Sequence, residues 1–294
     1  MSYMCFDIGG TSIKYGVSEP NGKLLLKGGL PNEVHEKGVD SFMDSLVSVT
    51  ESCRQRYNVQ GIGVATAGVV DPGRGVVLDY SGFFPPDFAL GELLEQRCGI
   101  SCAVENDANA AALGEYWLGE GRGAEFFYCI TVGSGIGGAA VLHGNLIQGV
   151  SYGAGEVGHQ QIGVKEGLLG QLASTSALVS RVAKKKGTTG TNLNGLKIFT
   201  MAQDGDPDAM DAVEKQMEFL ATGIANICHI LNPDRFIVGG GISAQADYLF
   251  PLLDAALRKR LLPLTYKNMS LRFAGLKNDA GMIGALYNYL QKHG

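Results

Sequence analysis

Two stretches of similar design, FDIGGTSIKYGV at residues 6–17 and ITVGSGIGGAAV at residues 130–141, begin the two halves of this 294-residue chain. Each stretch has the pattern of a strand, a turn rich in glycine and a second strand. Two such units predict a duplicated domain with a cleft between the copies. The length agrees with this prediction, because a chain of this size can form about two domains that each bury a core.

The sequence around these stretches alternates between strand and helix patterns, which predicts an α/β fold with mixed sheets. The helix expected at residues 40–57, for example, places Phe42, Leu46 and Cys53 on one face. The other expected helices are 90–96, 107–118, 174–185, 207–231, 247–261 and 280–291. The expected strands are 4–8, 13–18, 23–27, 60–65, 126–132, 139–142 and 235–238.

Composition and charge exclude several classes of protein. The net charge is -5 and no basic block occurs, which argues against nucleic acid as the main partner. The sequence contains no run of about 18 apolar residues, so no membrane span is predicted. No secretory signal is visible at the N-terminus. The six cysteines are scattered, as expected for reduced thiols in a cytoplasmic protein.

Three clusters of glycine stand out, at residues 7–11, 133–138 and 239–241. Glycine lets backbone N–H groups approach phosphate oxygens, so these turns are candidate phosphate sites. The second cluster matches G-x-G-x-x-G, but a strand pattern follows it where a dinucleotide site needs a helix. Asp7, at a strand end beside such a turn, is placed to hold the Mg²⁺ of a nucleotide through water. The alternative is a pair of hairpins that bind no ligand.

Five motifs together resemble the ROK family of bacterial sugar kinases and repressors. They are DIGGT (7–11), ENDANAAALGE (105–115), TVGSGIGG (131–138), GEVGH (155–159) and IVGGGIS (237–243). The resemblance implies a duplicated actin-like ATPase (ribonuclease H-like) fold, with two domains around an ATP and sugar cleft. It also implies a kinase that uses ATP and Mg²⁺ to phosphorylate a hydroxyl, expected to be O6, of a hexose, an amino sugar such as N-acetylmannosamine, or a β-glucoside.

The same resemblance implies a domain division and a set of site residues. A small domain at residues 1–107, completed by the helix at 280–294, would precede a larger domain at 108–279. The phosphate and nucleoside sites would be formed by Asp7, Gly9, Gly10, Thr11, Lys14, Thr131, Gly133, Ser134, Gly135, Gly239, Gly240 and Gly241. The sugar would be bound by Gly68, Ser81, Asn106, Asp107, Glu156, His159 and Glu166, with Asp107 as catalytic base.

The residues themselves are compatible with these roles for Asp107, Glu156 and His159. Asp107 opens an alanine-rich helix, where a carboxylate is favoured, and phosphoryl transfer needs a base to orient the hydroxyl and accept its proton. The alternative is that Asn106 or Asp107 only caps the helix. Glu156 and His159 lie among glycines and could bind two sugar hydroxyls, or they could be surface polar residues.

The sequence departs from the family pattern on the sugar side. Many members carry a cysteine motif that binds zinc together with the histidine, whereas residues 160–171 contain no cysteine. Because His159 alone cannot form a tetrahedral site, we predict no zinc. Gly170 stands where the family has a sugar-binding glutamate, for which Glu166 is the candidate replacement, and Ser81 stands where it has an asparagine.

Two other functions are compatible with the resemblance. One is a catalytically inactive sugar-binding protein, and the retained Asp7 and Asp107 argue against it. The other is a ROK transcriptional regulator without its DNA-binding domain. Such regulators place a winged helix-turn-helix domain ahead of the first motif, and here six residues precede Asp7. The family also implies a homodimer.

Overall fold

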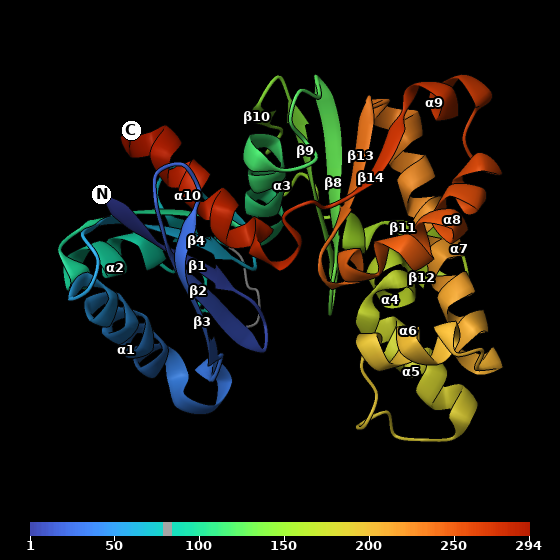
Figure 1. Cartoon of the computed structure of the whole chain (residues 1–294), viewed down its shortest axis with the longest axis horizontal. Coiled ribbons are helices and arrows are strands. Elements are labelled where there is room, and N and C mark those ends of the chain that lie inside the picture. The colour runs from blue at the N-terminus through green and yellow to red at the C-terminus, as the bar shows by residue number, and fades with distance from the viewer. Residues whose placement is uncertain (79–83) are drawn as a thin grey trace. The chain divides into compact units, whose positions relative to one another are not determined.

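The computed structural model describes residues 1–78 and 84–294, and it divides into two compact units, each built around its own sheet (Figure 1). No helix in the described part of the chain is long and apolar enough to cross a membrane. The first unit consists of Met1–Arg122, Gln148–Ala154 and Asn278–Gly294, and the second of Gly123–Ile147 and Gly155–Lys277.

The sheet of the first unit has five strands in the order β3-β2-β1-β4-β7. The first three strands are antiparallel, and β4 and β7 run parallel to β1. Ile8, Thr66 and Asn106 are therefore neighbours in register at one edge, where the three parallel strands end. The strands are β1 (Ser2–Ile8), β2 (Ser12–Ser18), β3 (Leu24–Pro31), β4 (Val59–Thr66) and β7 (Ser101–Asn106).

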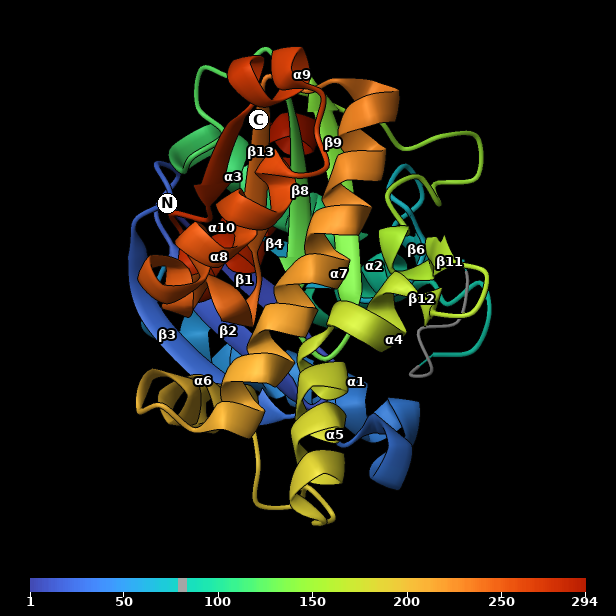
Figure 2. The ribbon, with the colours of Figure 1, turned by 90° about the vertical axis from the view of Figure 1, so that its right-hand side faces the viewer.

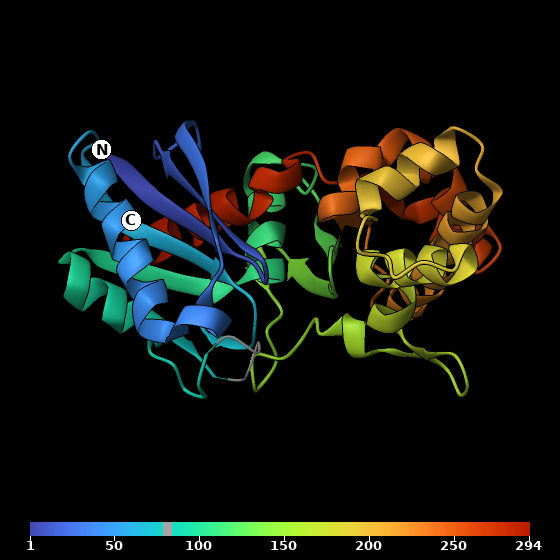
Figure 3. The same cartoon turned by 90° about the horizontal axis from the view of Figure 1, so that it is seen from below.

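Helices cover both faces of this sheet (Figures 1 and 3). Along β1, Met4 and Phe6 pack toward α1 (Val34–Arg54) and α2 (Leu90–Cys98), because alternate residues of a strand point to opposite faces. Cys5 instead packs against the helix α10 (Ala280–His293). The remaining elements of the unit are α3 (Asp107–Leu118), α10 (Ala280–His293), β5 (Val70–Asp71) and β6 (Val76–Val77).

Helices α3 and α10 pack backbone to backbone. A Cβ atom at Gly284 would lie 1.6 Å from the carbonyl oxygen of Ala110, and one at Gly114 would lie 2.5 Å from that of Ala280. This packing places α3 in the first unit. The sequence prediction put a domain boundary at residue 107 and gave this helix to the second domain, so the observed division differs from it.

The second unit repeats the design of the first. Its sheet has the order β10-β9-β8-β13-β14, with an antiparallel β8–β9 hairpin and with β13 parallel to β8. The prediction of a mixed α/β fold with a repeated strand–turn–strand unit is confirmed. The strands are β8 (Phe126–Val132), β9 (Ile136–Leu142), β10 (Asn145–Leu146), β13 (Arg235–Gly239) and β14 (Ser270–Phe273).

A layer of helices buries one face of this second sheet (Figure 2). Tyr128, Ile130 and Val132 of β8 form one core cluster with apolar residues of the helices α4 to α8. A small hairpin, β11 (Gln161–Gly163) and β12 (Gly167–Leu168), precedes these helices. The helices are α4 (Leu169–Ala173), α5 (Thr175–Lys186), α6 (Gly195–Gln203), α7 (Pro207–Leu231), α8 (Ala246–Arg258) and α9 (Pro263–Asn268).

Candidate functional site

The first turn joins β1 to β2 and carries a charged pair. Ile8 and Ile13 are the last paired residues, and the backbone N–H of Gly9 donates to the Ser12 carbonyl at 3.0 Å. Asp7 and Lys14 face each other on the two strands next to this turn, and the Lys14 ammonium lies 2.8 Å from Oδ2 of Asp7. The Asp7 side chain is 14% exposed, so a ligand can reach its carboxylate.

The start of α10 lies against this carboxylate. A Cβ atom at Gly281 would be 2.8 Å from Cγ of Asp7, so glycine is needed there for the helix to come this close. The N-terminus of a helix favours negative charge, which suits an ionised Asp7. Carboxylate oxygens are the ligands that Mg²⁺ prefers, and Asp7 therefore fits the predicted metal role.

Asn106 caps helix α3 and links it to a neighbouring loop. Its Oδ1 accepts from the backbone N–H groups of Ala108 at 2.9 Å and Asn109 at 3.0 Å, and its Nδ2 donates to the Gly68 carbonyl at 3.0 Å. Oδ1 of Asp107 accepts from Ala108 N–H at 2.8 Å. The structure thus brings Gly68, Asn106 and Asp107 together, and it gives the capping role to Asn106.

A buried acid that sequence reasoning missed holds the start of α3. Glu105 is 2% exposed and accepts hydrogen bonds from Asn106 N–H at 2.9 Å, Asn109 Nδ2 at 3.0 Å and Gln148 Nε2 at 3.2 Å. Burial raises the pKa of its carboxyl, and the hydrogen bonds from Asn109 and Asn106 act in the opposite direction. Glu105 therefore fixes the backbone that presents Asp107.

These groups share one edge of the first sheet. Asp7 lies at the carboxyl end of β1, and Asn106 at the carboxyl end of β7, two strands away. Neighbouring strands are about 4.8 Å apart, so the two strand ends are separated by about 10 Å. Ligands of open α/β sheets bind outside the carboxyl ends of the strands.

The second turn joins β8 to β9 and is one residue shorter than the first. Val132 pairs with Ile136, and the N–H of Gly133 donates to the Gly135 carbonyl at 2.9 Å. The N–H of Thr175, at the start of α5, donates to the Gly133 carbonyl at 2.8 Å. Cβ atoms at Gly133 and Gly135 would have no atom within 4 Å, so the backbone of this turn is open to a ligand.

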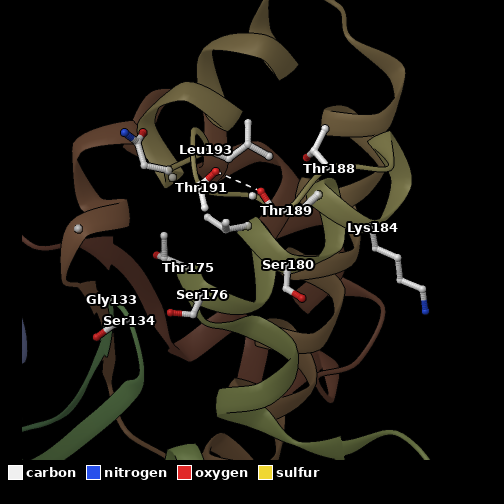
Figure 4. A pocket seen from close by; sticks show the side chains of 16 residues that line it. Gly133, Ser134, Thr175, Ser176, Ser180, Lys184, Thr188, Thr189, Thr191 and Leu193 are labelled. Atoms are coloured by element: carbon white, nitrogen blue, oxygen red, sulfur yellow. Dashed lines mark hydrogen bonds between the residues drawn. The ribbon is translucent and has the colours of Figure 1, made fainter.

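A pocket of about 820 Å³ opens beside this turn, in the size range of small-molecule sites (Figure 4). Seven of its sixteen lining residues carry a hydroxyl group, and two of these, Thr175 and Ser176, come from the first turn of α5, the end of a helix that favours an anion. Apart from the turn residues, sequence reasoning missed this lining. It consists of Gly133, Ser134, Thr175, Ser176, Val179, Ser180, Ala183, Lys184, Thr188, Thr189, Gly190, Thr191, Leu193, Asn194, Gly195 and Gly241.

The three glycines at the end of β13 differ in what they do. Gly239 ends the strand. Gly240 has a φ of +77°, and a Cβ atom there would lie 2.5 Å from the Val132 carbonyl oxygen, so it is required by the fold. Gly241 lines the pocket, and a Cβ atom at this position would have no atom within 4 Å. Of the predicted nucleoside glycines, Gly241 is thus the one that faces the pocket.

The residues predicted for the sugar in the second unit lie in two places. Glu156 precedes the short 3₁₀ helix Val157–His159 and His159 ends it, and both side chains are exposed. A Cβ atom at Gly170 would lie 3.2 Å from the Gly158 carbonyl oxygen, so position 170 adjoins this helix. Glu166 lies in the turn of the β11–β12 hairpin, where its Oε2 accepts from Lys165 N–H at 3.2 Å. This turn is at the opposite end of the hairpin from the Leu169 N–H to Gln160 carbonyl bond.

The structure does not test two of the predictions, the role of Ser81 and the absence of zinc. Ser81 lies outside the described residues. Within the ranges that are described, no three His, Cys, Asp or Glu side chains gather where they could hold a metal ion, and the six cysteines are buried thiols. The absence of zinc stays a prediction for elemental analysis of the purified protein.

Known proteins resemble this chain over nearly its whole length. A model of the ROK family matches residues 3–292. An uncharacterised protein of Clostridium perfringens is 38% identical over 290 residues, covering 98% of this chain and 97% of that protein. A β-glucoside kinase of Listeria monocytogenes is 32% identical over 304 residues, covering 99% and 98%. The structure of a ROK family glucokinase from Streptomyces griseus, in complex with glucose and AMPPNP, aligns with a TM-score of 0.88 at 28% identity, covering 97% of this chain and 98% of that chain.

Proposed function

Because this chain belongs to the ROK family, we propose that it is an ATP-dependent sugar kinase that moves the γ-phosphate of ATP to a sugar hydroxyl. Its two mixed five-stranded sheets form the actin-like fold of that family, as the sequence predicted. The observation that supports the activity best is the hydroxyl-lined pocket at the open turn Gly133–Gly135, beside the start of α5. Such a site suits a phosphorylated nucleoside, and the Streptomyces griseus glucokinase holds AMPPNP.

Each of the two turns offers groups that suit a nucleotide. In the second turn, Ser134 would bind phosphate through its N–H and hydroxyl groups, beside the open backbone of Gly133 and Gly135, and Thr175 and Ser176 would bind it through their hydroxyl groups. Gly241 would lie by the nucleoside. Asp7 would hold Mg²⁺ through water, with Lys14 beside it. When bound, the metal neutralises charge on the phosphates, which is a main part of phosphoryl transfer.

The sugar would be phosphorylated at the start of α3. Asp107 would accept the proton of the attacking hydroxyl, expected to be O6, while Asn106 keeps the helix start in place. Glu156 and His159 would bind further hydroxyls. Gly170 offers no carboxylate beside that short helix, so the sugar contacts there would differ from those of family members with a glutamate at this position.

The test is a coupled assay of ADP release over a panel of hexoses, N-acetylmannosamine and β-glucosides. We expect turnover with at least one class, and loss of turnover in Asp107→Asn. If the chain binds a sugar of the panel but no sugar of the panel gives ADP release, the result would support the alternative of an inactive sugar-binding protein. Sedimentation of the purified chain tests the expected homodimer separately.

A further inference from the structure

We propose that Asn32 is a positioning residue, which holds the Gly9 and Thr11 carbonyl groups of the first phosphate loop away from the nucleotide. The inference rests on the proposed function. Asn32 follows β3, and 8% of it is exposed. Its Nδ2 donates to the Gly9 carbonyl at 2.9 Å, and its backbone N–H donates to the Thr11 carbonyl at 3.1 Å. One residue thus holds two carbonyl groups of a single short turn.

The consequence is a separation of donors from acceptors in the turn. The Ser12 carbonyl is occupied by Gly9 N–H, and the Gly9 and Thr11 carbonyls by Asn32. By contrast, no acceptor for the N–H groups of Gly10 and Thr11 is found in the described parts of the chain, and both residues are exposed. Successive free N–H groups form an anion site, whereas a carbonyl oxygen turned outward would repel phosphate.

An amide is suited to this position by its chemistry. Oδ1 of Asn32 accepts from the Val34 N–H at 3.3 Å, while Nδ2 serves the Gly9 carbonyl, so both ends of the amide are used. Aspartate would keep the acceptor but would place a carboxylate oxygen against the Gly9 carbonyl. Leucine has nearly the same shape and neither function.

The second turn supports the inference independently. Gly133 occupies the position of Gly9 in the two repeated stretches, and its carbonyl is also occupied, by the backbone N–H of Thr175 at 2.8 Å. The same carbonyl is thus held in both turns, by different groups. Because the donor in the second turn is a backbone group, the first turn is the one that depends on a particular side chain.

The experiment compares ligands with and without phosphate. In Asn32→Leu we expect ATP and ADP to bind about tenfold more weakly, the effect of losing about one hydrogen bond's contribution. Adenosine, which has no phosphate, should bind as in the wild type, and so should a sugar substrate in the absence of nucleotide. Calorimetric titration of the full chain measures all four affinities. The matched control is Asn21→Leu, the same change in the exposed turn at the other end of β2 and β3.

The possible outcomes separate this inference from the kinase function. Unchanged ATP affinity, or an equal loss for adenosine, would overturn the role of Asn32. A wild-type chain that binds no ATP would overturn the proposed function and the inference with it. If Asn32→Leu unfolds, Asn32→Asp takes its place, because it keeps the shape and the acceptor for Val34. Its loss of ATP affinity should persist at high salt, whereas a pure charge effect would be screened.

Discussion

The turns that follow β1 and β8 have a similar backbone and different chemistry. In both, the N–H of the first glycine closes the turn and its carbonyl is held by a group from another element. Beside the first turn, Asp7 and Lys14 face each other across the hairpin, whereas the equivalent pair beside the second turn is Thr131 and Gly137. The second turn also adjoins the pocket with hydroxyl groups in its lining. The difference suggests a division of roles. The first unit would supply charge, metal binding and the base, and the second would bind the nucleoside.

The largest effect should come from Asp107, which tests whether the chemistry belongs to the first unit. Asp107→Asn should lower kcat by roughly 10²–10⁴-fold, the range for loss of a general base. The melting temperature should hardly change, because Asn106 is the residue that caps α3. Asn106→Ala is the control and should cost about 1 kcal/mol of stability. A normally active Asp107→Asn protein would show that Asp107 is not the catalytic base.

Two glycines of the second unit should separate folding from binding. Gly240→Ala should cost about 2–4 kcal/mol of stability, because the new Cβ atom meets the Val132 carbonyl in a left-handed backbone. Gly133→Ala has free space for its Cβ atom and should fold normally. It should nevertheless weaken ATP binding about tenfold by displacing one hydrogen bond to phosphate. Thermal melting and titration with ATP distinguish the two, and equal melting temperatures would contradict the structural role of Gly240.

A smaller, pH-dependent effect should come from Glu105, beneath the start of α3. Burial raises its pKa from an ordinary value of 4.5, so the folded chain binds this proton more tightly than the unfolded chain. Its contribution to stability is therefore full below about pH 4.5 and is lost as the pH rises through the raised pKa. The glutamine side chain of Glu105→Gln cannot titrate, so the melting temperature of this variant should rise relative to that of the wild type as the pH increases from about 4 to about 7. Glu92→Gln, on the exposed side of α2, should show no such trend.

The smallest effect should come from the charged pair of the first turn. Lys14 is 42% exposed, so Lys14→Met should lower the free energy of unfolding by less than about 1 kcal/mol. If the charge serves the ligand, ATP affinity should fall more at low than at high ionic strength. Denaturant melts and titrations at two salt concentrations test both statements. A stability loss well above this limit would mean that the pair serves the fold instead.

The sequence predicted the features that depend on local pattern. The repeated turns, the start of α3 at Asp107 and the full extent of α7 agree with the structure. It missed β14, because four residues are too few for a clear alternation, and α6, which begins at a glycine and contains Ile198 and Thr200. Most of the predicted site residues lie in the five motifs, whereas Lys14, Gly68, Ser81 and Glu166 lie outside them, and the roles of all of them stay predictions.

Features assembled from distant segments could not be predicted in this way. Thr175, Ser176 and Ser180 have the spacing of an ordinary polar helix surface, and only the fold places them around a pocket. In the sequence, nothing distinguishes Asn32 from other asparagines that follow a strand, and only the structure shows its contact with Gly9. The boundary at residue 107 differed because the contact between Gly284 and Ala110 joins positions 174 residues apart in the sequence (284 − 110).

That last contact also bears on how the chain folds during synthesis. Residues 280–293 cover α3 and one face of the first sheet, yet the ribosome makes them after every residue of the second unit. N-terminal domains usually fold first as a chain emerges. Here the first unit must wait with an apolar face uncovered, while the second already has all its segments. The part of the protein that is translated first is therefore the part that is completed last, and its uncovered apolar face needs protection from aggregation on the way.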